Sequence, residues 1–101
     1  MFYIKDKQKE ARQAIAKHVG TYCQKYRKEV LHLKVQEFSD LFNMNRISIT
    51  SFENGRSNSF LYLFLYEQAT IGEYNKRLFW ENLFANAPNI KELMKEDDDI
   101  E

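Results

Sequence analysis

Residues 33–58 read LKVQEFSDLFNMNRISITSFENGRSN, and this stretch decides the fold. Apolar residues at helical spacing stand on both sides of Asn43-Met44-Asn45, which predicts a helix over 35–42, a turn, and a second helix. The second helix begins after Asn45, because asparagine is a favourable N-cap. It ends at Gly55, because glycine adopts the left-handed closing conformation without penalty. The stretch therefore predicts two short helices joined by a tight turn.

The apolar positions of these two helices are spaced to meet one core. We expect six of their side chains to point inward: Val35, Phe38, Leu41, Phe42, Ile49 and Phe52. Upstream of the stretch, a period of 3.6 residues predicts a long helix over 6–27. Its inward face is expected to carry Ala11, Ala14, Ile15, His18, Val19, Tyr22 and Tyr26.

The second half of the chain predicts two more helices, over 60–68 and 73–86. The apolar run from Phe60 to Tyr66 is compatible with a helix or a strand, and its helical neighbours favour a buried helix. Three glycines and one proline in 101 residues also favour helices. The sequence thus predicts an all-α protein. A compact five-helix domain over 1–94 is expected, followed by a solvated acidic tail over 95–101.

The stretch 33–58 resembles the helix-turn-helix of the lambda-repressor-like, Cro-type (XRE) family, whose pattern is L-T-Q-x-x-L-A-x-x-x-G-V-S-x-x-x-I-S-x-x-E-N-G-x-x-x-P. The strongest part of the match is ITSFENGR at 49–56, with Phe38 and Met44 at the family's apolar positions. The match needs no gap. Four positions depart from the pattern: Val35 stands for Gln, Ser39 for Ala, Asn43 for the turn Gly, and Ser59 for Pro. Asparagine accepts a positive φ, so the turn is retained.

The resemblance implies a lambda-repressor-like fold with its helix-turn-helix core over 33–58. It also implies a sequence-specific DNA-binding regulator, a small dimeric repressor of phage or bacterial type. In this family the second helix of the motif enters the major groove. The base-contacting candidates are therefore Asn45, Arg46, Ile47, Ser48, Thr50 and Ser51, and the phosphate-contacting candidates are Lys34, Gln36, Arg56 and Asn58. Arg46 is the first candidate for base readout, because its guanidinium matches guanine O6 and N7.

The glutamate of the motif, Glu53, is expected to be structural rather than a contact to DNA. In the family this position often pairs with a basic residue on the first helix. The resemblance therefore implies a pair with Lys28 or Arg27, and the sequence leaves both alternatives open.

The helix expected over 73–86 carries apolar side chains on most of its sides. Leu78, Phe79 and Trp80 are consecutive and therefore point about 100° apart. The aromatic residues of this helix either complete the core or form a contact between two copies. We favour a homodimer, because exposed apolar patches mark interfaces and helix-turn-helix proteins commonly bind as two-fold dimers. The expected interface residues are Phe79, Trp80, Leu83 and Phe84.

The formal net charge is zero, from 15 basic and 15 acidic side chains. This neutrality is a cancellation, because residues 1–35 carry a net charge of +6 and residues 36–101 carry −6. The last seven residues, 95–101, carry a net charge of −4. Neutrality therefore does not argue against a nucleic-acid partner, and the tail over 95–101 is expected to oppose DNA binding through its charge.

Several other classes of protein find no support in the sequence. His18 and Cys23 would lie about 140° apart around a helix, so they form no nucleophile–base pair, and we expect no enzyme. No spacing suits a zinc site and no glycine-rich phosphate loop is present, so we expect no metal and no cofactor. One cysteine and the lack of a signal peptide predict a cytoplasmic protein. The longest apolar run has seven residues, which predicts no membrane span.

A rival hypothesis keeps the fold and discards DNA. The expected recognition helix carries a single basic residue, Arg46, and residues 36–101 are acidic. In this alternative the chain is a protein-binding module or inhibitor that acts through its acidic C-terminal half. Binding to duplex DNA at varied salt separates the two hypotheses.

Overall fold

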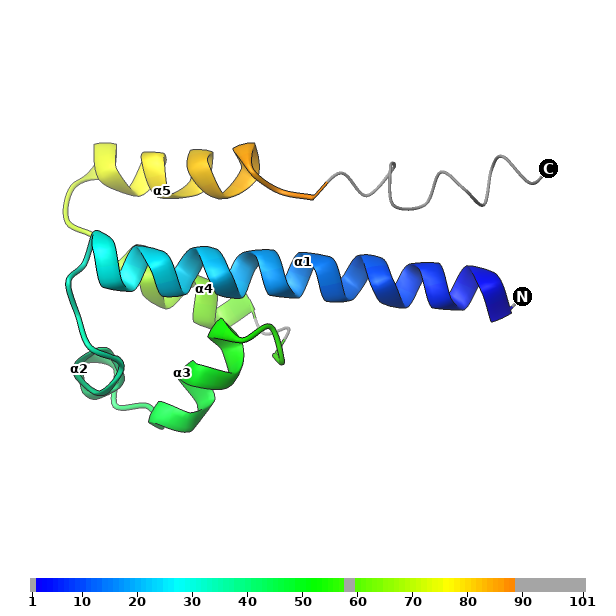
Figure 1. The fold of residues 1–101 in the computed structure, drawn as a ribbon. Helices are drawn as coiled ribbons and strands as arrows, with labels where there is room; N and C mark the ends of the chain where they lie inside the picture. The colour runs from blue at the N-terminus through cyan, green and yellow to red at the C-terminus, as the bar shows by residue number, and fades with distance from the viewer. Residues whose placement is uncertain (1, 58–59, 89–101) are drawn as a thin grey trace.

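The computed structural model describes residues 2–57 and 60–88, so Asn58, Ser59 and the expected tail over 95–101 lie outside the described residues. The described residues form five α-helices and no strand, which confirms the all-α class. In chain order the helices are α1 (Phe2–Glu29), α2 (Val35–Leu41), α3 (Arg46–Glu53), α4 (Phe60–Gln68) and α5 (Glu73–Ala85). In the view of Figure 1, α2, α3 and α4 lie below α1 and α5 lies above it, while Trp80 of α5 also packs against Phe64 of α4.

The helix boundaries follow the local signals of the sequence. The Asn45 side chain caps α3, since its Oδ1 accepts a hydrogen bond of 2.7 Å from the Ile47 amide. Gly55, just beyond the end of α3, has a φ of 76°, and Asn43 in the turn before α3 has a φ of 51°. Both turn predictions are therefore confirmed. The helix expected over 6–27 is longer than predicted at both ends.

The core lies where α1, α2, α3, α4 and α5 converge. Its buried apolar residues are Cys23, Tyr26, Phe38, Ile49, Phe52, Leu63, Tyr66, Phe79 and Leu83. Phe38 and Tyr66 stack with their ring centroids 4.5 Å apart, which joins α2 to α4. The four apolar residues that carry the resemblance all pack in this core or against it: Phe38, Met44, Ile49 and Phe52.

Two of the side chains expected to point inward do not. Leu41 is 59% exposed, so the prediction that it faces the core is wrong. The ring of Phe42 packs edge-on against Phe38 at 5.2 Å and occupies the inner side at this end of α2. Leu41 lies about 100° further round and is turned outward. Ile15 is 42% exposed, although Ala11, one turn nearer the N-terminus of α1, is buried.

α1 and α3 cross at Gly20. A Cβ atom added at this glycine would lie 2.6 Å from the Glu53 carbonyl oxygen, and closer still to that of Phe52. Only a residue without a side chain permits this approach of one helix to the backbone of the other. The crossing therefore sets the position of α3 relative to α1.

α5 is attached to the body by three polar side chains spaced four residues apart on α1. His18 Nε2 donates to the Leu83 carbonyl oxygen at 2.9 Å, and the Tyr22 hydroxyl donates to that of Phe79 at 2.7 Å. The Tyr26 hydroxyl lies 2.7 Å from Thr70 Oγ1, just before α5. The predicted apolar face of α1 thus also carries three polar groups, and each of them forms a hydrogen bond to α5 or to the segment before it.

None of the helices in the described residues combines the length and the apolar character that a membrane crossing requires.

Candidate nucleic-acid interface

The N-terminal half of α3 forms an exposed surface. Asn45, Arg46, Ile47 and Thr50 are exposed, with Ile47 at 69%, while Ser48 and Ser51 are half-buried. Residues four apart share one face of a helix, so Arg46 and Thr50 lie on the same side. The carbonyl oxygen of the Asn45 side chain is occupied by its cap to Ile47. Of the six residues that the sequence predicts to contact bases, three are therefore best placed to meet a ligand: Arg46, Ile47 and Thr50.

A buried ion pair fixes the C-terminal end of α3 to α1. Arg27 on α1 holds both carboxylate oxygens of Glu53, with Nε to Oε2 at 2.8 Å and Nη2 to Oε1 at 2.9 Å. A third bond runs from Arg27 Nη1 to the Leu33 carbonyl oxygen at 2.7 Å. The Tyr66 hydroxyl of α4 donates to Glu53 Oε2 at 2.8 Å. Of the two basic partners that the resemblance allowed for Glu53, the structure selects Arg27.

Burial makes this network depend on all of its members. Arg27 and Glu53 are 4% and 3% exposed, so each ion relies on the other for solvation. The hydrogen bonds from Arg27 to Glu53 raise the pKa of the guanidinium. Burial, followed by the charge of Glu53, raises the pKa of the Tyr66 phenol well above its usual range. The network joins α1, α3, α4 and the segment before α2, and it fixes the direction in which α3 presents its exposed end.

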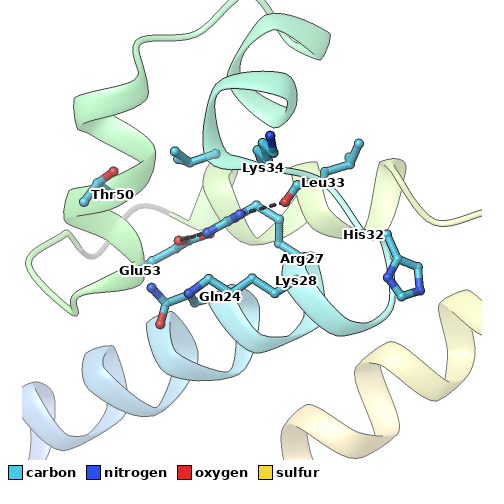
Figure 2. A pocket seen from close by; sticks show the side chains of 9 residues that line it. Gln24, Arg27, Lys28, His32, Leu33, Lys34, Thr50 and Glu53 are labelled. Atoms are coloured by element: carbon cyan, nitrogen blue, oxygen red, sulfur yellow. Dashed lines mark hydrogen bonds and ion pairs between the residues drawn. The ribbon is translucent and has the colours of Figure 1, made fainter.

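A basic hollow of about 590 Å³ lies between the end of α1, the start of α2 and the middle of α3. Its lining residues are Gln24, Arg27, Lys28, His32, Leu33, Lys34, Val35, Thr50 and Glu53. Figure 2 shows the Arg27–Glu53 pair at its centre, with Lys34 on one side of the pair and Gln24 and Lys28 on the other. Three cationic side chains and one carboxylate leave the lining with a net charge of +2 when His32 is neutral.

The sequence reasoning missed Gln24, Lys28 and His32 as parts of this surface. Lys28 stands in the last turn of α1, where a cation is favoured by the helix dipole. In the sequence it carries no separate signal, because it is one of several basic residues on the polar sides of the long helix. His32 lies in the linker after α1 and has a positive φ of 55°, a conformation that no pattern in the sequence predicts.

The residues expected to contact phosphate are only partly brought together. Lys34 is exposed and lines the basic hollow, and its backbone amide donates to Glu37 Oε1 at 2.8 Å. Gln36 is exposed, but its amide donates to Asp40 Oδ1 at 2.9 Å. Arg56 is exposed beyond the C-terminal end of α3 and does not line the hollow. Asn58 lies outside the described residues.

The four residues expected at a dimer interface separate into two groups. Phe79 and Leu83 are 0% and 3% exposed and pack in the monomer's own core, which corrects the expectation for these two residues. Phe79 lies against the rings of Tyr22 and Tyr26, and this contact determines which side of α5 faces inward. Phe84 is 68% exposed and Trp80 is half-buried, so these two remain available to a partner.

Trp80 and Phe84 belong to an aromatic patch that also includes α4. Trp80 packs edge-on against Phe64 at 5.5 Å and stacks with Phe84 at 6.2 Å. Phe64 and the nearby α4 residue Leu61 are 49% and 61% exposed. The Trp80 indole donates to Glu67 Oε2 at 2.8 Å, which fastens the patch across the two helices. The sequence reasoning missed Leu61 and Phe64, because it placed the whole run from Phe60 to Tyr66 in a buried helix.

Cys23 and His18, which the sequence predicts not to form a nucleophile–base pair, lie in structural surroundings. Cys23 is buried and free, and burial, followed by Glu53, raises the pKa of its thiol. His18 is hydrogen-bonded to the end of α5. Over residues 2–57 and 60–88 the structure brings together no group of three His, Cys, Asp or Glu residues that could hold a metal ion.

Comparison with protein families, with curated proteins and with solved structures finds no match to this chain.

Proposed function

We propose that this chain is a sequence-specific, double-stranded-DNA-binding regulator with a lambda-repressor-like helix-turn-helix, acting as a small repressor of phage or bacterial type. One observation carries the proposal. The N-terminal half of α3 is exposed, with Arg46, Ile47 and Thr50 on the surface, while its C-terminal end is fixed by the buried Arg27–Glu53 pair. A helix that is rigidly held at one end and exposed at the other is suited to insertion into a groove.

The exposed side chains of α3 have the chemistry that the major groove requires. Each base pair presents a distinct set of donors, acceptors and methyl groups there. The Arg46 guanidinium can donate two hydrogen bonds to guanine O6 and N7, and Ile47 can pack against a thymine methyl group. Thr50 can donate or accept. These three residues account for base readout in the proposal, while Lys34 and Arg56 supply phosphate contacts that orient the helix.

The charge distribution agrees with this orientation. Residues 1–35, which form α1 and lead into α2, carry +6, and the hollow beside α3 is basic. The acidic residues 95–101 carry −4 and lie outside the described residues. We propose that they oppose DNA binding through their charge, so that removing them raises affinity most at low salt.

Selection from random duplexes, followed by anisotropy titration of the selected duplex, tests the function. We expect affinity to fall steeply with salt through counterion release. Arg46→Ala should cost about 1–3 kcal/mol and relax the preference at one base pair. The matched control is Arg77→Ala, which removes an exposed arginine from α5. If no duplex binds at low salt, the proposal is overturned and the protein-binding alternative gains support.

We further propose that the regulator is a homodimer, joined through the aromatic patch of Leu61, Phe64, Trp80 and Phe84. Such an exposed cluster on two adjacent helices is suited to the apolar centre of an interface between copies. Two copies related by a two-fold axis would place two α3 helices on successive half-sites, roughly 34 Å apart along the duplex.

A further inference from the structure

We propose that the basic hollow between α1, α2 and α3 is a phosphate site, held by Lys28 and Lys34, that takes one backbone phosphate of the bound duplex. This inference rests on the proposed function for the identity of the ligand. It assigns a contact to Lys28, a residue outside the helix-turn-helix stretch 33–58.

The charge balance of the hollow favours an anion. Glu53 is its single carboxylate, and both of its oxygens are already engaged, Oε1 by Arg27 and Oε2 by Arg27 and Tyr66. Within the described part of the chain, neither Lys28 nor Lys34 forms an ion pair. Two ammonium groups therefore share an open hollow whose one carboxylate is already paired with Arg27.

The hydrogen-bond donors of the hollow also suit an oxyanion. The Arg27 guanidinium has five N–H groups, and its bonds to Glu53 and Leu33 use three of them. The amide of Gln24 lines the same hollow. A phosphate group between Lys28 and Lys34 would accept from charged donors, which form the stronger class of hydrogen bond.

The position of the hollow favours a phosphate that belongs to a duplex. Lys28, His32, Lys34 and Thr50 are all exposed, so the hollow is open enough to admit a phosphate that remains attached to a polymer. Thr50 stands four residues after Arg46 on the same face of α3. A duplex read by Arg46 would therefore run past the hollow, and one backbone phosphate could enter it.

The test compares Lys28→Ala with Lys25→Ala, a second exposed lysine of α1 that does not line the hollow. Both variants remove one positive charge. Duplex affinity is measured from about 50 to about 200 mM salt. We expect Lys28→Ala to lower the slope of log affinity against log salt by about 0.9, with unchanged base preference, because one phosphate contact is lost. Lys25→Ala should change the slope much less. Equal effects of the two variants would overturn the proposal.

A second arm uses inorganic phosphate alone, followed by amide chemical shifts in the full chain. We expect shifts at Lys28, Lys34 and Thr50 in the natural protein and weaker ones in Lys28→Ala. If no duplex binds but these shifts occur, the proposed function fails, while the hollow stands as a phosphate site filled from a free source. If neither the duplex nor phosphate affects these residues, both proposals fail.

Discussion

Arg27 and Glu53 form a buried, two-point ion pair that joins α1 to α3, with N–O distances of 2.8 and 2.9 Å. A guanidinium reaches both oxygens of a carboxylate at once, which a lysine ammonium cannot do with the same geometry. The pair therefore transmits the orientation of the long helix α1 to the helix proposed to read DNA.

Breaking this pair from one side should be far more damaging than removing it altogether. We expect Arg27→Ala to lower the free energy of unfolding by about 3–5 kcal/mol, because Glu53 is left buried without its cation. The double variant Arg27→Leu, Glu53→Leu should lower the free energy of unfolding clearly less than the sum of the losses caused by Arg27→Leu alone and by Glu53→Leu alone. Urea unfolding measures both quantities. Arg77→Ala, at an exposed position, serves as the control and should stay within about 0.5 kcal/mol. Additive effects would show that the two side chains act independently.

This pair shows where sequence reasoning succeeds and where it ends. The spacing of Phe38, Ile49 and Phe52, and the special roles of Asn43 and Asn45, are local signals, and the structure agrees with each of them. The family resemblance leaves two adjacent residues, Arg27 and Lys28, as partners for Glu53. Neighbours in sequence point about 100° apart on a helix, so the choice depends on the rotation of α1 against α3, which no local pattern contains.

The same limit explains the aromatic residues of the second half. α5 carries Leu78, Phe79 and Trp80 in a row, and because neighbours point about 100° apart, no rotation of this helix can bury all three fully. Its contact with Tyr22 and Tyr26 buries Phe79 and leaves Phe84 outside. The basic hollow could not be predicted from the sequence either, because its lining residues come from three helices and a linker that approach one another only in the folded chain.

Gly20 offers a direct test of the helix crossing. Replacing it with alanine would usually stabilise a helix interior by roughly 0.5–1 kcal/mol. Here we expect the opposite, a loss of about 1–3 kcal/mol, because the new methyl group meets the carbonyl oxygens of Phe52 and Glu53. Thr21→Ala, at the exposed neighbouring position, is the control and should be neutral or slightly stabilising. Thermal unfolding shows whether Gly20→Ala raises or lowers the stability. A stabilising Gly20→Ala would mean that α1 and α3 do not cross this closely.

Alkaline pH should loosen the attachment of α5 to α1 and that of α4 to α3, which rest on the hydroxyl groups of Tyr22 and Tyr66. Burial, with smaller effects of Tyr26 and Cys23, raises the pKa of Tyr22 to about 12, while an unfolded tyrosine ionises near about 10. The folded state therefore keeps a proton that the unfolded state releases, so this stabilisation is complete below about pH 10 and is lost as the pH rises toward 12. Burial and Glu53 act in the same direction on the pKa of Tyr66.

Tyrosinate absorbance, recorded with the helical circular dichroism signal, checks this prediction. Of the six tyrosines, we expect Tyr22 and Tyr66 to ionise last and together with the loss of helix. Tyr22→Phe removes one late step and identifies it. Complete ionisation of all tyrosines near pH 10 in a fully helical protein would contradict the buried placement of these two hydroxyl groups.

The thiol of Cys23 should be almost inert in the folded protein. Its side chain is fully buried, and burial together with Glu53 raises its pKa, so the reactive thiolate is scarce at neutral pH. We expect a disulfide reagent to modify it only as fast as the protein opens, and at the ordinary rate of a free thiol in urea. Rapid modification without denaturant would show that the contact between α1, α3 and α4 opens easily.

Assembly should depend on the exposed part of the aromatic patch. Phe84 is 68% exposed and stacks on Trp80, so Phe84→Asp should leave the monomer folded while it places a charge in the proposed interface. We expect sedimentation at micromolar concentration to show a dimer for the natural protein. Phe84→Asp should weaken it by at least about tenfold, or roughly 1.4 kcal/mol. Tyr74→Asp, equally exposed on α5 but outside the patch, is the control and should not change the dimer. A natural protein that remains monomeric, or equal weakening by both variants, would show that this patch does not join the copies.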